Sequence, residues 1–352
     1  MKFTDFSIKT KLLIVLVPLF LVISLVLVYL VGSYFKEEVK NNSWNKLSNA
    51  IELFQNISKN FEEDALLISK FFAQYPFVNT AYKTDDPEKS FSILKKNTDL
   101  LISKLTDNPN NFKIHFHKPP ATSFYRSWTN KRNDDLSNFR KTILEVYRTK
   151  QPLKGIELGV GGFAIRGITP ILDTNKNYLG SVEYFFTPKD VMKLLKTSDS
   201  KLGFFSMVDA NLADQLFEKK ELEKSFEKKE LNYYISKASE EWIAADKILN
   251  LIKDSINSTS SYSILNLDNF SVGIFKINDY SGQNVGNIVF VQDNTEQEKL
   301  NQSRILVISL IIVSSFLILF IVLLYLLNKT VVNPLNTALS FVKKIENGDF
   351  NF

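Results

Sequence analysis

Two long runs of apolar residues lie near the two ends of the chain, at residues 12–31 and 305–327, and neither contains a charged residue. A helix of about 20 residues crosses the roughly 30 Å hydrocarbon core of a bilayer, so both runs are long enough to span it. A cleavable signal peptide is the alternative for the first run, but residues 29–35 offer no cleavage site of the Ala-x-Ala kind. We therefore predict two transmembrane helices.

A long helix is predicted directly after the first apolar run. Apolar residues recur every three or four positions from Trp44 to Phe72, and neither proline nor glycine interrupts residues 33–74. A helix continuous over residues 12–72 would be about 90 Å long, at about 1.5 Å per residue. Its apolar stripe must be covered by a domain folded against it or by a partner helix. We expect Pro76 to end it, so that the predicted signalling helix covers residues 32–75.

Residues 76–190 alternate between helical and strand patterns. The predicted elements are a helix at 87–105, a turn at 107–111, a strand at 112–117, a helix at 136–149 and a hairpin of residues 155–172 and 178–186. In the first strand, Phe112, Ile114 and Phe116 alternate with polar residues, which is typical of a strand with one buried face. A small antiparallel sheet backed by helices is the α+β arrangement of PAS-like folds.

The same pattern recurs more weakly in residues 191–304. The predicted elements are a strand at 202–208, a charged helical stretch at 218–254 and strands at 261–267, 270–277 and 285–292. This repetition indicates two PAS-like modules in series, a membrane-distal one at 76–190 and a membrane-proximal one at 191–304. Their boundary is expected near residues 188–200.

Several stretches of the first module resemble the double Cache sensory domain found in methyl-accepting chemotaxis proteins and sensor histidine kinases. These stretches keep their order between Phe112 and Glu183: His115-Phe116-His117-Lys118-Pro119-Pro120, Ser123-Phe124-Tyr125-Arg126-Ser127-Trp128, Asp134-Asp135-Leu136 with Phe139-Arg140, Gly155-Ile156-Glu157-Leu158-Gly159, Ile165-Arg166-Gly167-Ile168-Thr169-Pro170 and Gly180-Ser181-Val182-Glu183. Asn133 stands where the family pattern has glycine. The resemblance implies an α+β fold: two tandem PAS-like (double Cache) modules on a long N-terminal helix, flanked by two transmembrane helices.

Residues 328–352 resemble the first helix of a HAMP relay domain, whose second helix and output domain lie outside this sequence. Leu335, Ala338, Val342 and Ile345 step by three, four and three positions, which is the seam of a parallel helical bundle. HAMP domains are cytoplasmic, so the resemblance implies an inner-membrane protein with two spans, both termini in the cytoplasm and the sensory region outside. Three lysines in the predicted cytoplasmic N-terminus, residues 1–11, favour the same orientation.

The two resemblances together imply a chemoreceptor that forms a homodimer and acts on cytoplasmic signalling proteins. The sensory region of a histidine kinase or of a cyclic-di-GMP enzyme is the alternative. A receptor that recognises a periplasmic binding protein instead of a free ligand is a third possibility.

Composition excludes several classes of function. The chain has no cysteine among its 352 residues, which rules out disulfides, c-type haem and thiolate metal sites. Its net charge of +5 is spread thinly, with no basic cluster that would indicate nucleic-acid binding. Gly159, Gly161 and Gly162 lack the lysine and the strand–turn–helix setting of a phosphate loop. No nucleophile–base–orienter set is evident. We therefore expect no catalytic residues, no enzyme activity and no cofactor.

The first candidate ligand residues are Arg126 and Trp128, in a segment expected to be a loop after the first strand, with Tyr125 beside them. Arginine presents a planar fork of donors that matches a carboxylate, and tryptophan offers an apolar wall. An Arg-x-Trp element resembles one in amino-acid-binding double Cache domains, although Thr129 stands where those have tyrosine. The alternative is an arginine stacked on a core tryptophan. The expected partner is a small molecule that carries a carboxylate.

His115 and His117 lie two residues apart and so share one face of the predicted strand. Two imidazoles can bind a metal or respond to pH, but the sequence identifies no third ligand, so we predict pocket-lining histidines and no metal site.

The other candidates are Arg140 and Glu183. Arg140 can pair with the Asp134–Asp135 doublet or contact a ligand, whereas one of those aspartates is expected to cap a helix that begins at Leu136. Glu183 can pair with Arg166 across the hairpin or contact a ligand.

Overall fold

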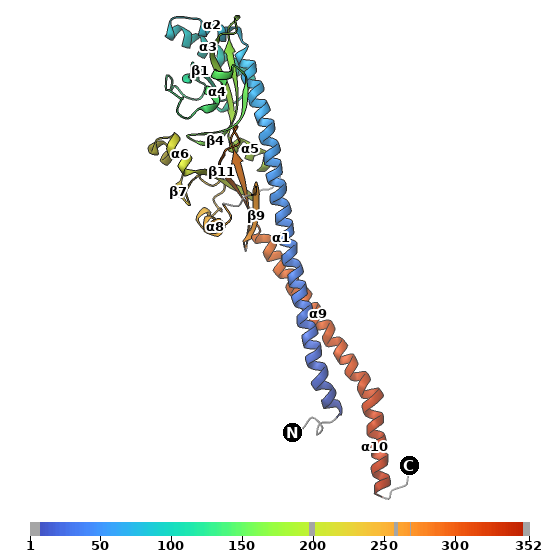
Figure 1. Ribbon diagram of the computed structural model, residues 1–352. Coiled ribbons are helices and arrows are strands. Elements are labelled where there is room, and N and C mark those ends of the chain that lie inside the picture. Colours follow the sequence, from blue (N-terminus) through green and yellow to red (C-terminus); the bar gives the residue numbers. More distant parts are fainter. Residues whose placement is uncertain (1–7, 197–200, 257–259, 268, 348–352) are drawn as a thin grey trace. The chain divides into compact units, whose positions relative to one another are not determined.

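The computed structural model describes residues 8–196, 201–256, 260–267 and 269–347 (Figure 1). The chain divides into two compact units. One, Ser43–Asp293, contains both β-sheets and is called the sheet unit; the other combines Met1–Asn42 with Asn294–Phe352 and is called the helical unit. The predictions made for residues 1–7 and 348–352, at the cytoplasmic N-terminus and the end of the HAMP-like segment, lie outside the described residues.

The helical unit contains the two apolar runs. Its elements are the first part of α1 (Ile8–Ala73), then α9 (Thr295–Leu327), the π-helical turn η3 (Asn328–Val332) and α10 (Asn333–Glu346). Both apolar stretches are helical and long enough to cross a membrane, with mean hydropathies of 3.1 and 3.2. The ring of Phe20 lies 5.8 and 5.5 Å from those of Phe316 and Phe320. The predicted apolar helices are therefore confirmed as elements.

Helix α1 is continuous over 66 residues, as its uninterrupted helical period predicts. Most of its predicted stripe packs on the sheet unit: Leu47, Ile51, Phe54 and Phe72 are buried, whereas Trp44 stays 45% exposed. The stripe is therefore covered by a domain of the same chain. The helix ends at Ala73, and Pro76 begins the short α2 (Pro76–Tyr82), which the sequence did not indicate.

The first sheet has five antiparallel strands in the order β2-β1-β5-β4-β3. Its strands are β1 (Ile114–Lys118), β2 (Thr122–Arg126), β3 (Leu153–Gly159), β4 (Gly162–Leu172) and β5 (Tyr178–Phe186). The helical segments beside it in the sequence are α3 (Pro87–Leu105), the 3-10 turn η2 (Pro109–Asn111), α4 (Lys141–Thr149) and α5 (Pro188–Lys196). Helix α3 begins as predicted because the Asp86 side chain accepts hydrogen bonds from the backbone N–H groups of Glu88 and Lys89.

Three predictions for this sheet need correction. Residues 122–126 form strand β2 instead of a loop, and the expected strand at 155–172 turns back on itself at Val160–Gly161 to give β3 and β4. Helix α4 begins at Lys141, so neither aspartate caps it; Asp135 instead accepts from the backbone N–H of Ser137 at 2.9 Å.

The second sheet has six strands in the order β7-β8-β6-β11-β10-β9. Its strands are β6 (Leu202–Asp209), β7 (Lys228–Glu230), β8 (Tyr233–Ile235), β9 (Tyr262–Leu267), β10 (Phe270–Asn278) and β11 (Asn284–Asp293), and its helices are α6 (Ala210–Leu216), α7 (Lys219–Ser225) and α8 (Ala245–Ile252). The four predicted strands are confirmed. The predicted helical stretch at 218–254 is helical only at its two ends, in α7 and α8. Between them, Leu231 and Asn232 adopt left-handed conformations that turn the chain from β7 into β8.

One apolar core joins the two sheets. It includes Leu158 and Phe163 from the first sheet, Phe204 and Phe290 from the second, and Phe54 from α1. Gly167 of β4 and Gly273 of β10 both lie against α1, so this helix packs on both sheets. The division into modules at 76–190 and 191–304 stays a prediction, and residues 197–200 of its expected boundary are not among those described.

Candidate functional site

A histidine pair and a glutamate lie on adjacent strands of the first sheet. In the antiparallel register of β1 and β5, His115 stands opposite Glu183, and His117 opposite Ser181. His115 Nδ1 lies 3.0 Å from Glu183 Oε1, and His117 Nδ1 lies 3.0 Å from Ser181 Oγ. The two imidazole rings are 4.0 Å apart, so the prediction that they share a face is confirmed.

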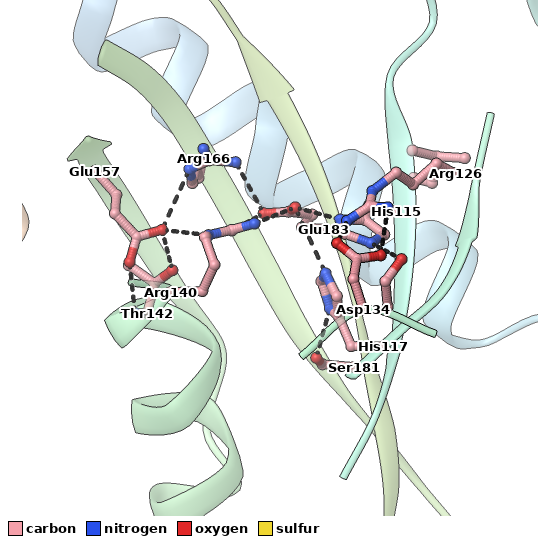
Figure 2. A network of polar contacts seen from close by, with 12 residues as sticks. His115, His117, Arg126, Asp134, Arg140, Thr142, Glu157, Arg166, Ser181 and Glu183 are labelled. Carbon is pink, nitrogen blue, oxygen red and sulfur yellow. Dashed lines mark hydrogen bonds and ion pairs between the residues drawn. The ribbon is translucent and has the colours of Figure 1, made fainter. Parts of the chain in front are cut away.

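Two buried arginines connect this glutamate to a second one (Figure 2). Arg140 donates from Nε to Glu157 Oε2 at 2.7 Å and from Nη1 to Glu183 Oε1 at 2.9 Å, and its Nη2 donates to Glu183 Oε2. Arg166 Nη1 donates to Glu183 Oε2 at 3.2 Å, so the ion pair across the hairpin, one of the two alternatives for these residues, is formed. Glu157 also accepts from the backbone N–H and the hydroxyl of Thr142, both at 2.8 Å. We call these four charged residues and the two histidines the buried network.

Burial and charge act on the pKa values of this network in opposite directions. Burial alone would raise the pKa of Glu183, but Arg140 and Arg166 outweigh it and hold that pKa well below its usual value. Burial lowers the pKa of both histidines, although Glu183 acts in the opposite direction, so both are neutral at pH 7. Burial and the neighbouring Arg140 also lower the pKa of Arg166.

Arg126 lies at the end of β2 and pairs with Asp134. Its Nη1 and Nη2 donate to the two oxygens of Asp134, both at 2.8 Å, and Nη1 also donates to the carbonyl of Lys131 at 2.9 Å. Burial would raise the pKa of Asp134, but Arg126 outweighs it and lowers that pKa. The fork that was expected to bind a carboxylate therefore already holds one from the protein.

A cavity of about 700 Å³ opens between the buried network and the Arg126–Asp134 pair. Five of the seven predicted site residues line it: His115, Arg126, Trp128, Arg140 and Glu183. The other two do not. Tyr125 donates to Asp99 of α3, and His117 is fully buried beside Ser181. Burial, reinforced by Asp99, raises the pKa of Tyr125.

Aromatic side chains form the apolar part of this cavity. Trp128 and Phe185 meet edge to face at 5.2 Å, and the Arg166 guanidinium lies 5.0 Å from the centroid of the Phe185 ring. Phe139 and Phe217 also line the cavity and contact each other at 5.3 Å. The lining therefore combines buried hydrogen-bonding groups with apolar surface, which is typical of small-molecule sites.

Sequence reasoning missed Glu157 and Phe185 as site residues and considered Asp134 only as a structural partner. For Arg166 it left a structural ion pair and a ligand contact open. Glu157 lies on β3, which the single predicted strand at 155–172 concealed, so its position opposite Arg140 was not readable. One signal in the sequence could have indicated Phe185. It lies two residues after Glu183 on β5, and residues two apart share a face of a strand.

Glu183 supplies the third group that the sequence did not identify beside the two histidines. His115, His117 and Glu183 offer ligand atoms within 4.8 Å of one another. However, Glu183 already accepts from Arg140 and Arg166, and a divalent ion would lie close to both guanidinium groups. Repulsion between a divalent ion and a unit charge at about 4 Å is of the order of 8 kcal/mol at an effective dielectric constant of about 20. The trio is therefore best described as a hydrogen-bonded network.

Ser123, His115 and Glu183 are joined in the order of a hydrolase triad. Ser123 Oγ lies 2.9 Å from His115 Nε2, whose other ring nitrogen faces Glu183. Ser123 is fully buried and lies outside the cavity lining, so its hydroxyl has no access to a substrate. Glu183 is also neutralised by two arginines, which weakens its effect on the imidazole. This arrangement orients His115; it does not activate a nucleophile.

Solved structures similar to this chain are sensory domains. They include an extracellular ligand-binding receptor from Desulfohalobium retbaense (12% identity, TM-score 0.39). The match covers 71% of this chain but only 40% of the receptor chain. Others are the ligand-binding domain of the Campylobacter jejuni chemoreceptor Tlp3 in complex with 4-methylisoleucine (12% identity, TM-score 0.40, covering 73% of this chain and 91% of that one) and the periplasmic domain of Vibrio cholerae LuxQ (11% identity, TM-score 0.41, covering 72% and 100%). No curated protein matches this sequence.

The family comparison covers most of the chain. Residues 40–297 match the dCache_3 model, described as the double sensory domain of two-component sensor kinases. The matched region contains both sheets and about half of α1, and the two apolar helical stretches flank it, which fits an inner-membrane protein. The chain therefore belongs to the dCache_3 family of double sensory domains.

Proposed function

We propose that this protein is a transmembrane receptor that binds a small molecule in the cavity beside the buried network. The observation that carries the proposal is the cavity itself. Its volume of about 700 Å³ falls within the range of ligand sites, roughly 300–1,000 Å³. Its lining pairs buried charged groups with an aromatic wall, and it lies in a domain of a sensory family.

Strand β4 provides a route from this cavity to α1. Arg166 lines the cavity, and the next residue, Gly167, lies so close to α1 that a Cβ there would be 2.1 Å from the backbone nitrogen of Leu66. Two residues further, Thr169 Oγ1 lies 2.7 Å from Ser69 Oγ of the same helix. A ligand that favours one position of β4 shifts α1, and through it the first apolar stretch.

The output follows from topology and the HAMP resemblance. Both termini lie in the cytoplasm, and the sheet unit lies outside the membrane. α10 passes the motion to a cytoplasmic output, as in a chemoreceptor, a histidine kinase or a cyclic-di-GMP enzyme. In a homodimer, α1 cannot pair through the residues buried against its own sheets. Leu53, Leu67 and Phe71, which are among its exposed apolar residues in the sheet unit, supply the contact instead.

A thermal-shift screen of the detergent-solubilised chain against amino acids, organic acids, amines and nucleosides tests this function. A direct ligand raises the melting temperature in proportion to the logarithm of its concentration. We expect at least one class to do so. If no compound shifts the melting temperature while a periplasmic binding protein does, the receptor recognises a protein and the proposed cavity function is wrong.

A further inference from the structure

Arg166 is the least satisfied charged group of the buried network. A guanidinium has five N–H donors, and the one hydrogen bond of Arg166 to a described residue runs from Nη1 to Glu183. Its Nε is buried and, among the described residues, has no hydrogen-bond acceptor; Glu157 Oε2 lies 3.3 Å away without hydrogen-bond geometry. A buried cation left short of acceptors is costly unless another group supplies them.

The carboxylates of the network can supply at most one more acceptor site, because a carboxylate has about four lone pairs. The two oxygens of Glu157 accept three hydrogen bonds, from Arg140 and twice from Thr142. The two oxygens of Glu183 accept four, from His115, twice from Arg140 and from Arg166. Arg166 has four donors left after its bond to Glu183, which is more than the one remaining lone pair of Glu157 can accept, so the cavity is the place for a further acceptor.

The other two arginines that line the cavity are satisfied. Arg140 uses Nε, Nη1 and Nη2 on carboxylate oxygens, and the glutamates raise its pKa although burial opposes this. Arg126 uses both of its terminal nitrogens on Asp134. An incoming anion would have to displace a protein carboxylate from either residue, whereas at Arg166 it displaces none.

The surroundings of Arg166 suit an anion with an apolar body. Nη2 lies against Gly159, where a Cβ would be 3.0 Å away, and Gly159 also lines the cavity. The same guanidinium lies over the ring of Phe185, and Phe185 contacts Trp128 edge to face. Lys113 Nζ lies 5.4 Å from the centroid of the Phe185 ring and adds a second positive charge to this end of the cavity.

We propose that Arg166 receives a carboxylate of the ligand, whose apolar part lies along Phe185 and Trp128. This assignment rests on the proposed ligand-binding function and moves the carboxylate contact from Arg126, the residue that the sequence favoured, to Arg166. It also connects binding to signalling, because the residue that meets the ligand is the neighbour of the glycine that meets α1.

Phenylacetate is the probe, because it joins one carboxylate to one ring, and phenylacetamide is its neutral match. Both are titrated at millimolar concentrations into the detergent-solubilised full chain, and the melting temperature is followed. Phenylacetate should raise it and phenylacetamide should not. Arg166→Gln should weaken phenylacetate binding about ten- to a hundredfold, the usual effect of losing a charged hydrogen bond. Arg132→Gln should leave the affinity unchanged, because Arg132 pairs with Glu88 away from the cavity.

A second variant guards against misfolding of Arg166→Gln. Gly159→Ala keeps every charge but places a methyl group against Arg166 Nη2, so it should also weaken phenylacetate binding. The assignment is overturned if phenylacetate does not shift the melting temperature or if phenylacetamide shifts it equally. It is also overturned if Arg166→Gln and Gly159→Ala both bind phenylacetate as tightly as the native sequence. A neutral compound that binds independently of Arg166 would overturn it as well, yet leave the receptor function standing.

Discussion

Arg140 holds the buried network together, because it pairs with both glutamates and is almost completely buried. Replacing it by leucine leaves two buried carboxylates without their main partner, which costs about 3–5 kcal/mol of unfolding free energy. Arg132→Leu is the matched control, since its partner Glu88 is largely exposed and such a pair is worth about 1 kcal/mol or less. Urea denaturation followed by tryptophan fluorescence measures both, and equal losses would contradict the role assigned to Arg140.

The two histidines predict a pH dependence of stability. Burial lowers the pKa of His115 and His117 in the folded state, so the unfolded chain binds more protons below about pH 6.5, the ordinary histidine pKa. Stability is therefore complete above that pH and falls below it, by up to about 1.4 kcal/mol per pH unit for each histidine. Glu183, whose pKa is also lowered, acts only below about pH 4.3, the ordinary glutamate value.

Urea denaturation at several pH values between 7 and 5 measures this dependence. The groups that face the histidines are Glu183, Arg140 and Arg126, of which only the glutamate could change its charge on further acidification. The double variant His115→Gln/His117→Gln should flatten the profile. A free energy of unfolding that stays constant down to pH 5 in the native sequence would show that the histidines are not desolvated as described.

At the scale of elements, the contact between β4 and α1 is fixed by one small residue. Gly167→Ala would place a Cβ 2.1 Å from Leu66 N and 2.2 Å from Ala65 C, so the helix has to move away from the sheet. Overpacking of this kind typically costs about 1–3 kcal/mol. We expect a clear loss of unfolding free energy for Gly167→Ala and little change for Gly161→Ala, where the added methyl group meets open space. Equal stability of the two variants would remove the proposed route from cavity to helix.

How far the sequence predicts these elements depends on how local their signals are. The period of α1 and the start of α3 at Pro87 are read within a few residues, and both predictions were correct. The β7–β8 hairpin was missed because its turn uses Leu231 and Asn232 and contains no glycine. β2 was predicted as a loop, because a strand of only five residues gives a short periodic signal.

The site shows the same division. The shared face of His115 and His117 follows from strand period and was predicted, and the Arg166–Glu183 ion pair is one of the two alternatives that the sequence left open. The contacts of Arg140 with Glu157 and Glu183 depend on how α4 packs against the sheet, which no local pattern encodes. Because α4 begins at Lys141, Asp134 lies outside it and pairs with Arg126, so the fork that the sequence suggested for a ligand carboxylate is occupied by a protein carboxylate.

At the scale of the whole molecule, homodimerisation can be tested on α1. The chain has no cysteine, so a single introduced thiol reports only on its own position. Leu67 is 66% exposed on α1. Leu67→Cys should form a disulfide-linked dimer on mild oxidation in membranes if this face pairs two chains. Thr174→Cys, on the exposed turn between β4 and β5, should not. Failure of Leu67→Cys and its neighbour Phe71→Cys to cross-link would exclude this face as the dimer contact.

The central claim is a topology: the sheet unit lies on the extracytoplasmic side of the membrane, and both chain ends lie in the cytoplasm. Labelling of single cysteines with a membrane-impermeant maleimide tests this directly in intact spheroplasts of a bacterial host. Thr174→Cys in the sheet unit should react without lysis, and Lys344→Cys in α10 should react only after the membrane is broken. Labelling of Lys344→Cys in intact spheroplasts, with Thr174→Cys protected, would contradict the proposed receptor.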